Sequence, residues 1–235
     1  LVEHPDGLVL IDTGSGNKET AKFHDIYGIE NAGADGRTAL EDGVRAAGFA
    51  LEDVTLVINT HLHFDHAGGN TWRDPAGVVR PSFPRARYVV QRGELAWATN
   101  TNERTAASYF PPNFAPLVEA GVLDLVDGAQ ELRPGLRVLP TPGHVPHHQS
   151  VLLDGGGVRA CFLGDVMPTS HHVPLPWIMG YDVEPLVTLE SKRRLLTEAV
   201  ADGWLLCFEH DAQVAWGQAA LDGKGFGLLP APTGG

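Results

Sequence analysis

The sequence predicts an α/β protein in which residues 1–235 form a single domain. Several short runs rich in Val, Ile and Leu have the length and composition of buried strands. Residues 185–201 repeat apolar side chains at helical spacing. A chain of 235 residues is long enough for one sizeable core, and its 28 Gly and 17 Pro indicate many turns.

The first quarter of the chain is expected to hold three strands and a helix. Residues 1–3 and 8–12 are expected to form two strands joined by a tight turn, and residues 54–59 a β-branched, buried strand. Between them, residues 38–47 carry apolar side chains at helical spacing, and Gly48 stops the helix. Residues 17–37 are mostly polar and are expected to be a loop or a short helix.

The middle of the chain is expected to alternate strands with irregular segments. Residues 71–84 are expected to be irregular, and a short helix is expected over residues 93–99. Residues 100–116 form an insertion rich in Pro and aromatic side chains, which can either cap a core or wall a substrate pocket. The expected strands are residues 87–91, 123–126, 136–139, 149–153, 158–163 and 204–208. Two closing strands and a Pro- and Gly-rich tail are expected to end the chain.

The helix over residues 185–201 begins with Pro185, which suits a first turn, and Gly203 stops it. The side chains expected on its buried face are Leu186, Leu189, Leu196, Ala199 and Val200. The side chains expected largely on the opposite face are Lys192, Arg193 and Glu198.

The chain is acidic, with 17 Lys and Arg against 29 Asp and Glu and a formal net charge of −12. Such a chain repels phosphate backbones, so no nucleic-acid partner is expected. No run is long and apolar enough to cross a membrane, so no membrane partner is expected either.

The two cysteines, Cys161 and Cys207, lie in apolar strand-like runs and form no Cys-x-x-Cys pair. This pattern predicts that both cysteines are reduced core residues of a cytoplasmic protein. The chain starts at Leu1 instead of Met, so a preceding segment can be missing, and the lack of a visible signal peptide carries little weight.

Four side chains that can bind a metal fall within six positions, namely His61, His63, Asp65 and His66. They follow directly after the strand at residues 54–59, and ligand sites in α/β sheets lie at such strand ends. Buried His and Asp side chains need partners, so four of them at one strand end predict a bound metal. The alternative is a polar loop that is rich in histidine by chance.

The backbone of this run must turn if all four side chains are to meet. Alternation along an extended chain points His61, His63 and Asp65 in one direction. His66 joins them only if the chain turns at Asp65 and His66, and the nearby Gly-Gly pair is expected to permit that turn.

The His-x-His-x-Asp-His run at residues 61–66 resembles the signature of the metallo-β-lactamase superfamily. Members of that family take further ligands from later strand ends, and the matching residues here are His144, Asp165 and His210. The turn at Asp12 resembles a family turn that packs under the metal loop, so Asp12 is expected to support the site. The resemblance implies a four-layer αββα sandwich with two mixed β-sheets, helices outside and metals at one sheet edge.

The resemblance also implies a site for two divalent metal ions, Zn first, with Fe, Mn or Co as alternatives. The expected ligands are His61, His63 and His144 for one ion, Asp65, His66 and His210 for the other, and Asp165 as the bridge. His148 is expected to hydrogen-bond a ligand, and His147 is expected to be peripheral.

Two ions about 4 Å apart share a water and lower its pKa toward neutrality, which gives a hydroxide nucleophile, so no protein nucleophile is needed. Asp65 is expected to orient this hydroxide and accept its proton. The sequence from Gly164 to Thr169, with the nearby Pro-Trp, resembles quorum-quenching lactonases of the YtnP-like kind. The implied activity is that of a metal-dependent hydrolase that opens a lactone ring or cleaves an ester, with N-acyl homoserine lactones favoured.

Two other functions stay open. A phosphotriesterase or arylesterase can use the same site in the same fold, and a non-catalytic domain can bind metal and serve in assembly. Other branches fit less well, because redox diiron members carry Glu at position 63 and β-lactamases lack a counterpart of Asp165. The 25 residues after His210 are too few for the helical domain that glyoxalase II members add.

The substrate is expected to be a small molecule with an apolar portion, and a homodimer is possible. Tyr181 or His172 is expected to donate a hydrogen bond to the substrate carbonyl or the leaving alkoxide. The side chains considered for an apolar acyl pocket are Phe64, Trp72, Phe83, Tyr109, Phe110, Phe114, Trp177, Ile178 and Met179. Aromatic side chains belong to a core more often than to a pocket, so the core is the alternative for this set.

Overall fold

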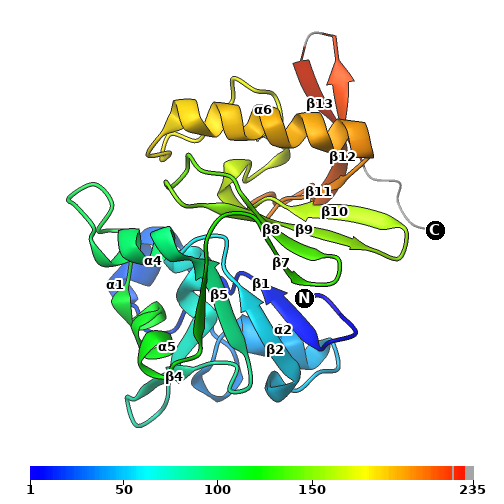
Figure 1. Ribbon diagram of the computed structural model, residues 1–235. Helices are drawn as coiled ribbons and strands as arrows, with labels where there is room; N and C mark the ends of the chain where they lie inside the picture. The colour runs from blue at the N-terminus through cyan, green and yellow to red at the C-terminus, as the bar shows by residue number, and fades with distance from the viewer. Residues whose placement is uncertain (224, 231–235) are drawn as a thin grey trace. The chain divides into compact units, whose positions relative to one another are not determined.

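The computed structural model describes residues 1–223 and 225–230, in two compact units, Leu1–Val126 and Asp127–Gly235 (Figure 1). Each unit has its own β-sheet and its own apolar core. The prediction that residues 1–235 form a single domain stays a prediction. The predicted Pro- and Gly-rich tail, residues 231–235, lies outside the described residues.

In the first unit, residues 1–126, four strands form a parallel sheet in the order β1-β2-β5-β6. These strands are β1 (Leu8–Ile11), β2 (Val54–Ile58), β5 (Arg87–Gln91) and β6 (Leu123–Val126). An antiparallel bridge between Val2 and Val9 borders this sheet. Most side chains of β1, β2 and β5 are buried, which is typical of parallel strands and explains their nearly continuous apolar sequence.

The helices of the first unit are α1 (Ala21–Tyr27), α2 (Ala39–Ala46), α3 (Phe64–Ala67), α4 (Arg92–Thr99) and α5 (Ala115–Glu119). Local sequence sets the start of α2, because Glu41 Oε2 accepts hydrogen bonds from Thr38 N (3.0 Å) and Thr38 Oγ1 (2.6 Å). Val44 of α2 then packs into a core cluster with Val57 of β2 and Tyr88 of β5. The predicted helix at residues 38–47 and the short helix within residues 17–37 are confirmed.

Residues 71–84 are not irregular throughout, so that prediction was wrong. Two short strands, β3 (Thr71–Arg73) and β4 (Val79–Pro81), form an antiparallel ribbon. Asp74 shapes the connecting turn, because its Oδ1 accepts from the backbone N–H groups of Ala76 (3.0 Å) and Val78 (2.8 Å). The turn therefore pairs two strands of only three residues each, which are too short to stand out in the sequence.

In the described part of the second unit, seven strands form a mixed sheet in the order β13-β12-β11-β10-β9-β8-β7. The strands are β7 (Gln130–Arg133), β8 (Leu136–Pro140), β9 (Gln149–Gly155), β10 (Val158–Phe162), β11 (Leu205–Cys207), β12 (Trp216–Asp222) and β13 (Gly225–Pro230). β10 and β11 pair in parallel, and the other neighbours are antiparallel. β7 was not predicted, because this edge strand is polar and largely exposed.

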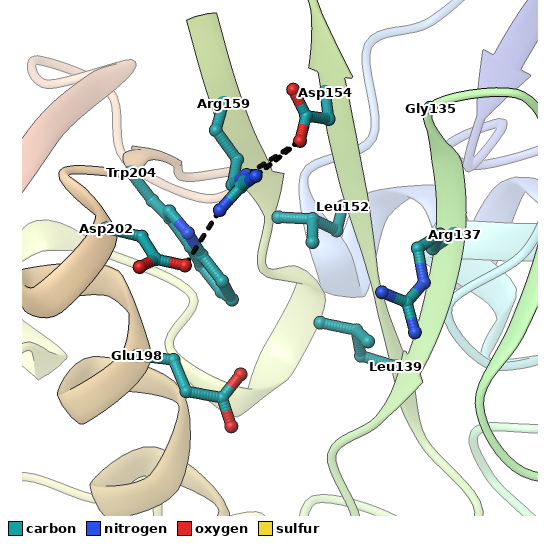
Figure 2. Close-up of a pocket in the computed structure, with 9 residues that line it drawn as sticks. All are labelled: Gly135, Arg137, Leu139, Leu152, Asp154, Arg159, Glu198, Asp202 and Trp204. Carbon is teal, nitrogen blue, oxygen red and sulfur yellow. Dashed lines mark hydrogen bonds and ion pairs between the residues drawn. The ribbon is translucent and has the colours of Figure 1, made fainter.

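The β9–β10 hairpin is tied to the end of the long helix α6 (Pro185–Asp202). Gly156 and Gly157 form its turn with φ values of 61° and 79°, the positive values that two-residue hairpins need. Figure 2 shows Arg159 of β10 between Asp154 of β9 and Asp202 of α6. The Nε–Oδ2 distance to Asp154 is 2.9 Å and the Nη1–Oδ2 distance to Asp202 is 2.7 Å. These ion pairs are partly exposed, so they contribute little to stability. Their main effect is to fix the position of the hairpin against the end of α6.

The ends of α6 agree with prediction, and Gly203 follows it with φ 67°. The predicted buried face was right for Leu196 and Ala199 and wrong for Leu186 and Lys192, and Leu189 and Val200 are half-buried. The buried side chains are Thr188, Ser191, Lys192, Leu195, Leu196 and Ala199, whereas Leu186 is 77 % exposed. In residues 1–223 and 225–230 no helix, α6 included, combines the length and apolar character that a transmembrane segment needs.

Lys192 is buried because the backbone before α6 supplies its partners. Its Nζ donates to the carbonyl oxygens of Pro174 (3.0 Å), Leu175 (3.2 Å) and Trp177 (2.6 Å). Three carbonyl acceptors offset the desolvation of one ammonium group. The buried apolar side chains of α6, Leu195, Leu196 and Ala199, belong to one core cluster with the strand residues Cys161 and Leu206.

Candidate metal centre

The predicted metal loop follows β2 and folds into one turn of helix. Ala67 N donates to His63 O (2.9 Å) and His66 N donates to the same oxygen (3.1 Å), so α3 begins at Phe64. The expectation of an extended backbone up to Asp65 was therefore wrong. Helical geometry, instead of strand alternation, sets the directions of Asp65 and His66.

Gly68 and Gly69 have a different role from the predicted one. Neither has a positive φ. A Cβ added at Gly68 would lie 2.4 Å from Gly16 N, and one added at Gly69 would lie 2.3 Å from Thr13 O. These glycines therefore allow the metal loop to pack against the turn after β1, and the loop needs no special backbone conformation at either position.

Within the first unit the structure brings the three predicted histidines together. The ring centroids of His61 and His66 are 4.1 Å apart, and those of His61 and His63 are 4.4 Å apart. One ligand nitrogen of His61 lies within 4.8 Å of one ligand nitrogen of His63. Asp65 joins the cluster with Oδ2 3.8 Å from His66 Nε2. His61 and His66 are fully buried, and the Asp65 side chain is 34 % exposed.

Two residues orient these rings from behind. Asp12 Oδ2 lies 2.9 Å from His66 Nδ1, and Thr60 donates to both Asp12 oxygens through its N and Oγ1, each at 2.7 Å. Thr60 Oγ1 also lies 3.0 Å from His61 Nδ1. With Nδ1 engaged, Nε2 of each ring is the nitrogen left to face a metal. The predicted supporting role of Asp12 is confirmed, and its φ of 52° marks a strained residue.

Glu94 is a second support that the sequence did not reveal. This fully buried carboxylate on α4 accepts from Leu62 N (3.0 Å) and Tyr109 Oη (2.9 Å). The Tyr109 ring packs edge-on against His63, with centroids 4.7 Å apart. Burial raises the pKa of Tyr109, and the Glu94 carboxylate raises it further, so this phenol stays a donor. Nothing in the sequence around Glu94 marks it, because its partners come from distant segments.

Within the second unit Asp165 lies between two predicted ligands. Its Oδ2 is 3.1 Å from His144 Nε2, and its Oδ1 is 3.2 Å from His210 Nε2. His144 and Asp165 are almost fully buried, whereas the His210 side chain is 37 % exposed. One carboxylate that offers an oxygen to each of two imidazoles has the arrangement of a bridging ligand.

His144 is held by Asp182, which the sequence did not reveal. Asp182 Oδ1 lies 3.0 Å from His144 Nδ1, and Asp182 Oδ2 accepts from Thr188 Oγ1 at 2.6 Å. Gly143 permits this packing, because a Cβ there would lie 2.3 Å from Thr188 N, and its φ is 137°. The Pro-Gly turn before His144 thus rests directly on the first turn of α6.

The two neighbouring histidines differ as predicted. His148 is fully buried, and its Nε2 accepts a hydrogen bond from Asp165 N at 3.1 Å. Its Nδ1 therefore carries the proton and lies 2.8 Å from Thr141 Oγ1. His147 is exposed. The predictions that His148 supports a ligand and that His147 is peripheral are confirmed.

The loop after Asp165 is joined to the loop that carries His210. His210 N donates to Pro168 O at 3.0 Å. Asp211 Oδ2 accepts from Ser170 N (2.9 Å) and Ser170 Oγ (2.5 Å), and these hydrogen bonds lower the pKa of Asp211. Asp211 therefore stays ionised and keeps the two loops in register.

The two predicted hydrogen-bond donors lie in the long loop before α6. Tyr181 is 80 % exposed. His172 is half-buried, with Nδ1 2.8 Å from Thr169 Oγ1, and burial lowers its pKa. Their assignment to substrate contacts stays a prediction.

The residues considered for an acyl pocket differ in their burial and in their contacts. Phe83, Tyr109 and Phe114 are buried, and Trp177 is 65 % exposed. Trp72 lies under Arg37, whose Cζ is 3.8 Å from the ring centroid. The structure places Phe64 and Phe110 in one aromatic cluster, which also holds Phe23 and Tyr27. Ile178 and Met179 are half-buried in the loop before α6.

The donor atoms in both units fit a divalent metal. They are imidazole nitrogens and carboxylate oxygens, the set that suits Zn and other first-row ions. Cys161 and Cys207 are strand residues of the second unit's sheet, and burial raises the pKa of both thiols. No thiolate chemistry is therefore expected from them.

Known proteins resemble this chain in both sequence and structure. A family model described as the metallo-beta-lactamase superfamily matches residues 1–210. An N-acyl homoserine lactonase of a Bacillus species is 28 % identical over 231 residues, covering 91 % of this chain and 80 % of the relative. A probable metal-dependent hydrolase from Staphylococcus aureus has a similar structure, with a TM-score of 0.82 at 26 % identity, covering 96 % of this chain and 78 % of the other. The dizinc quorum-quenching lactonase AidC shares the fold, with a TM-score of 0.78 at 21 % identity over 99 % of this chain and 78 % of the other.

Proposed function

This chain belongs to the metallo-β-lactamase superfamily and is a metal-dependent hydrolase, and from that premise we propose that it opens lactone rings at a centre of two divalent ions. N-acyl homoserine lactones are the leading substrates, in line with the activity for which the Bacillus relative is named. The observation that carries the proposal is Asp165, which offers one oxygen to His144 and the other to His210. A site for a single ion does not need a carboxylate whose two oxygens face ligands of two different ions.

We assign the seven predicted ligands to two ions, which we propose to be zinc. The ligands of the first ion are His61, His63 and His144, those of the second are Asp65, His66 and His210, and Asp165 joins both. Bound there, the ions would act as Lewis acids on the attacking water and on the scissile carbonyl group. Iron, manganese and cobalt also suit imidazole and carboxylate ligands.

The chain's own residues have three tasks in this proposal. Asp12 and Asp182 accept hydrogen bonds from Nδ1 of His66 and His144, which fixes each ring and raises the basicity of its Nε2. Asp65, with a partly exposed carboxylate, takes the proton of the attacking water and delivers it to the leaving alkoxide. His172 or Tyr181 donates a hydrogen bond to the substrate carbonyl or to that alkoxide.

The aromatic cluster supports a substrate with an apolar acyl chain. Phe64 directly follows the predicted ligand His63, and its ring centroid is 4.9 Å from that of Phe23 and 5.9 Å from that of Phe110. All three rings are half-buried, so they present apolar surface beside the metal loop. An acyl chain laid on such a surface loses contact with water, which stabilises the complex by about 0.8 kcal/mol for each buried CH₂ group.

The test is a substrate panel assayed with metal-free and zinc-reconstituted protein. It contains N-hexanoyl homoserine lactone, the phosphotriester paraoxon, phenyl acetate and nitrocefin. We expect turnover of the lactone with zinc and a loss of that turnover on chelation. Turnover of paraoxon or phenyl acetate without the lactone would replace lactonase with phosphotriesterase or arylesterase activity. Metal binding without turnover of any compound would favour the non-catalytic alternative.

A further inference from the structure

The backbone carbonyl group of His66 is held by three donor atoms from outside its own helix. Helix α3 is a single turn, so its carbonyl oxygens lack the partners that a longer helix supplies. His66 O accepts from Thr13 N (2.7 Å), Thr13 Oγ1 (3.0 Å) and Asn59 Nδ2 (3.3 Å). Thr13 is 1 % exposed and Asn59 is fully buried, so water does not replace these donors.

Asn70 fixes the two side chains that donate to this carbonyl group. It is fully buried, and its Nδ2 donates to Asn59 Oδ1 at 2.9 Å, while Asn59 Nδ2 donates to Asn70 Oδ1 at 3.3 Å. This reciprocal pair leaves the second N–H of Asn59 for His66 O. Thr13 Oγ1 lies 3.0 Å from both His66 O and Asn70 Oδ1, so its one hydrogen is shared between these acceptors. Asn70 therefore orients both donors toward His66.

The ends of two neighbouring strands hold opposite ends of His66. β1 and β2 pair in parallel, so the residues that follow them meet at one edge of the sheet. Asp12 Oδ2 lies 2.9 Å from the ring nitrogen Nδ1, and Thr60 Oγ1 donates to that carboxylate at 2.7 Å. Thr13 and Asn59, which adjoin them in the sequence, contact the carbonyl oxygen instead. The ring and the backbone of one predicted ligand are thus fixed separately.

We propose that Thr13 and Asn59 are positioning residues for the second ion, because they fix the backbone of its ligand His66. The inference rests on the proposed function, which assigns His66 to that ion. With its ring and its carbonyl group both held, this residue has little freedom to lose when a metal binds. Without the carbonyl contacts, the one-turn helix α3 can shift, and Nε2 of His66 shifts with it.

The alternative is a buried polar network that only stabilises the fold. The two roles differ in which ion they affect. His61 and His63, the proposed ligands of the first ion, precede α3 in the chain. A loss of positioning at His66 should therefore weaken the second ion and spare the first, whereas a general loss of stability affects both ions alike.

Thr13→Val tests the hydroxyl donor, because valine shares the branched shape of threonine and has no hydroxyl group. Competition with a chromogenic chelator gives the dissociation constants of both zinc ions, and His66→Ala identifies the second ion. We expect Thr13→Val to bind the second ion about tenfold more weakly and the first ion as the unmodified protein does. Thr13→Ser keeps the hydroxyl group and should restore the affinity to within about twofold.

Further variants test the amide donor and supply the control. Asn59→Leu removes the amide at similar size and should weaken the second ion by at least as much, since it also removes the partner of Asn70. Thr13→Ala covers the case in which the valine variant does not fold. Thr55→Val is the matched control, because Thr55 Oγ1 donates to Leu8 O (3.2 Å) in the same sheet. This variant also loses a hydrogen bond to a carbonyl group, and it should bind both ions as the unmodified protein does.

The outcomes separate this inference from the proposed function. Unchanged second-ion affinity in Thr13→Val or Asn59→Leu would remove that residue from the assignment, and so would a lack of rescue by Thr13→Ser. An equal loss in Thr55→Val would reduce the effect to stability. Each of these results refutes the positioning role and leaves the lactonase proposal standing, because none depends on lactone turnover. A single ion bound by the unmodified protein would refute the proposed centre of two ions and this inference with it.

Discussion

Asp182 Oδ1 lies 3.0 Å from Nδ1 of His144, a residue 38 positions earlier in the chain. This contact joins the loop before α6 to the turn that carries a predicted ligand. Thr188 Oγ1 holds the other Asp182 oxygen at 2.6 Å, so the carboxylate itself is fixed. Asp182 therefore orients the imidazole and leaves its Nε2 toward Asp165.

Asp182→Asn tests this orientation. The amide can still form one hydrogen bond but carries no charge, so it supports the imidazole less well. We expect zinc affinity to fall about 10–100-fold, measured by competition with a chromogenic chelator. Asp202→Asn removes a carboxylate from the exposed end of α6 and should leave the affinity unchanged. Equal zinc affinity in the two variants would show that Asp182 has no influence on the site.

Gly143→Ala should destabilise the second unit. A Cβ at this position would lie 2.3 Å from Thr188 N, and φ of 137° is unfavourable for any other residue. We expect the free energy of unfolding to fall by about 1–3 kcal/mol or more, measured by urea denaturation. Gly155→Ala is the matched control, because a Cβ there meets no atom within 4 Å. A similar loss in both variants would contradict the packing argument.

Lys192→Met should destabilise the protein and change its pH dependence. The substitution leaves the carbonyl groups of Pro174, Leu175 and Trp177 without their donor, which costs about 1–3 kcal/mol for each group that stays unsatisfied. Urea denaturation at pH 7 measures the loss. A variant as stable as the unmodified protein would show that water replaces the ammonium group at no cost.

The pH dependence has a definite sign. Burial lowers the pKa of Lys192 to about 8 in the folded protein, from 10.5. Between pH 8 and pH 10.5 the unfolded chain therefore binds more protons, and stability rises with pH by at most about 1.4 kcal/mol per pH unit. Lys192→Met removes this contribution, so its free energy of unfolding should rise less over that range. Parallel curves for the two proteins would contradict the low pKa.

Zinc should stabilise the folded chain, and the stabilisation should increase with the free zinc concentration. The predicted ligands of each unit are in place only in the folded state, so zinc binds that state preferentially. At a free zinc concentration 100 times the dissociation constant, we expect each bound ion to raise the free energy of unfolding by about 2.7 kcal/mol. Calorimetry at several zinc concentrations measures the shift in Tm, and magnesium is the control because it disfavours imidazole ligands. An equal shift with magnesium would argue against a histidine-rich site.

Phe64→Ala should change the preference for acyl-chain length. The Phe64 ring is 4.9 Å from Phe23 and 5.0 Å from Tyr27, so its loss removes a wall of the aromatic surface. If two methylene groups of a decanoyl chain lose their contact, kcat/KM for decanoyl relative to butanoyl homoserine lactone falls about tenfold. Phe49→Ala removes a ring packed on the core instead, and it should leave this ratio unchanged. A constant ratio in the Phe64 variant would place the acyl chain elsewhere.

Several features were predictable because they depend on neighbours in sequence. The strand at Val54–Ile58 follows from its β-branched apolar run, and α2 follows from apolar spacing that ends at Gly48. The His-x-His-x-Asp-His run likewise identified the loop after β2. The ribbon of β3 and β4 was missed, because each strand has only three residues and the turn contacts of Asp74 bring them together.

The sequence alone determined the α/β class, most helix and strand positions and the residues able to bind metal, since local periodicity and side-chain chemistry suffice for these. Tertiary structure alone decided which buried polar groups are satisfied. Glu94, Asp182 and Lys192 resemble surface residues in the sequence, and each is buried against partners from distant segments. A buried charge persists only where folding supplies such partners, and the spacing of residues along the chain carries no record of them.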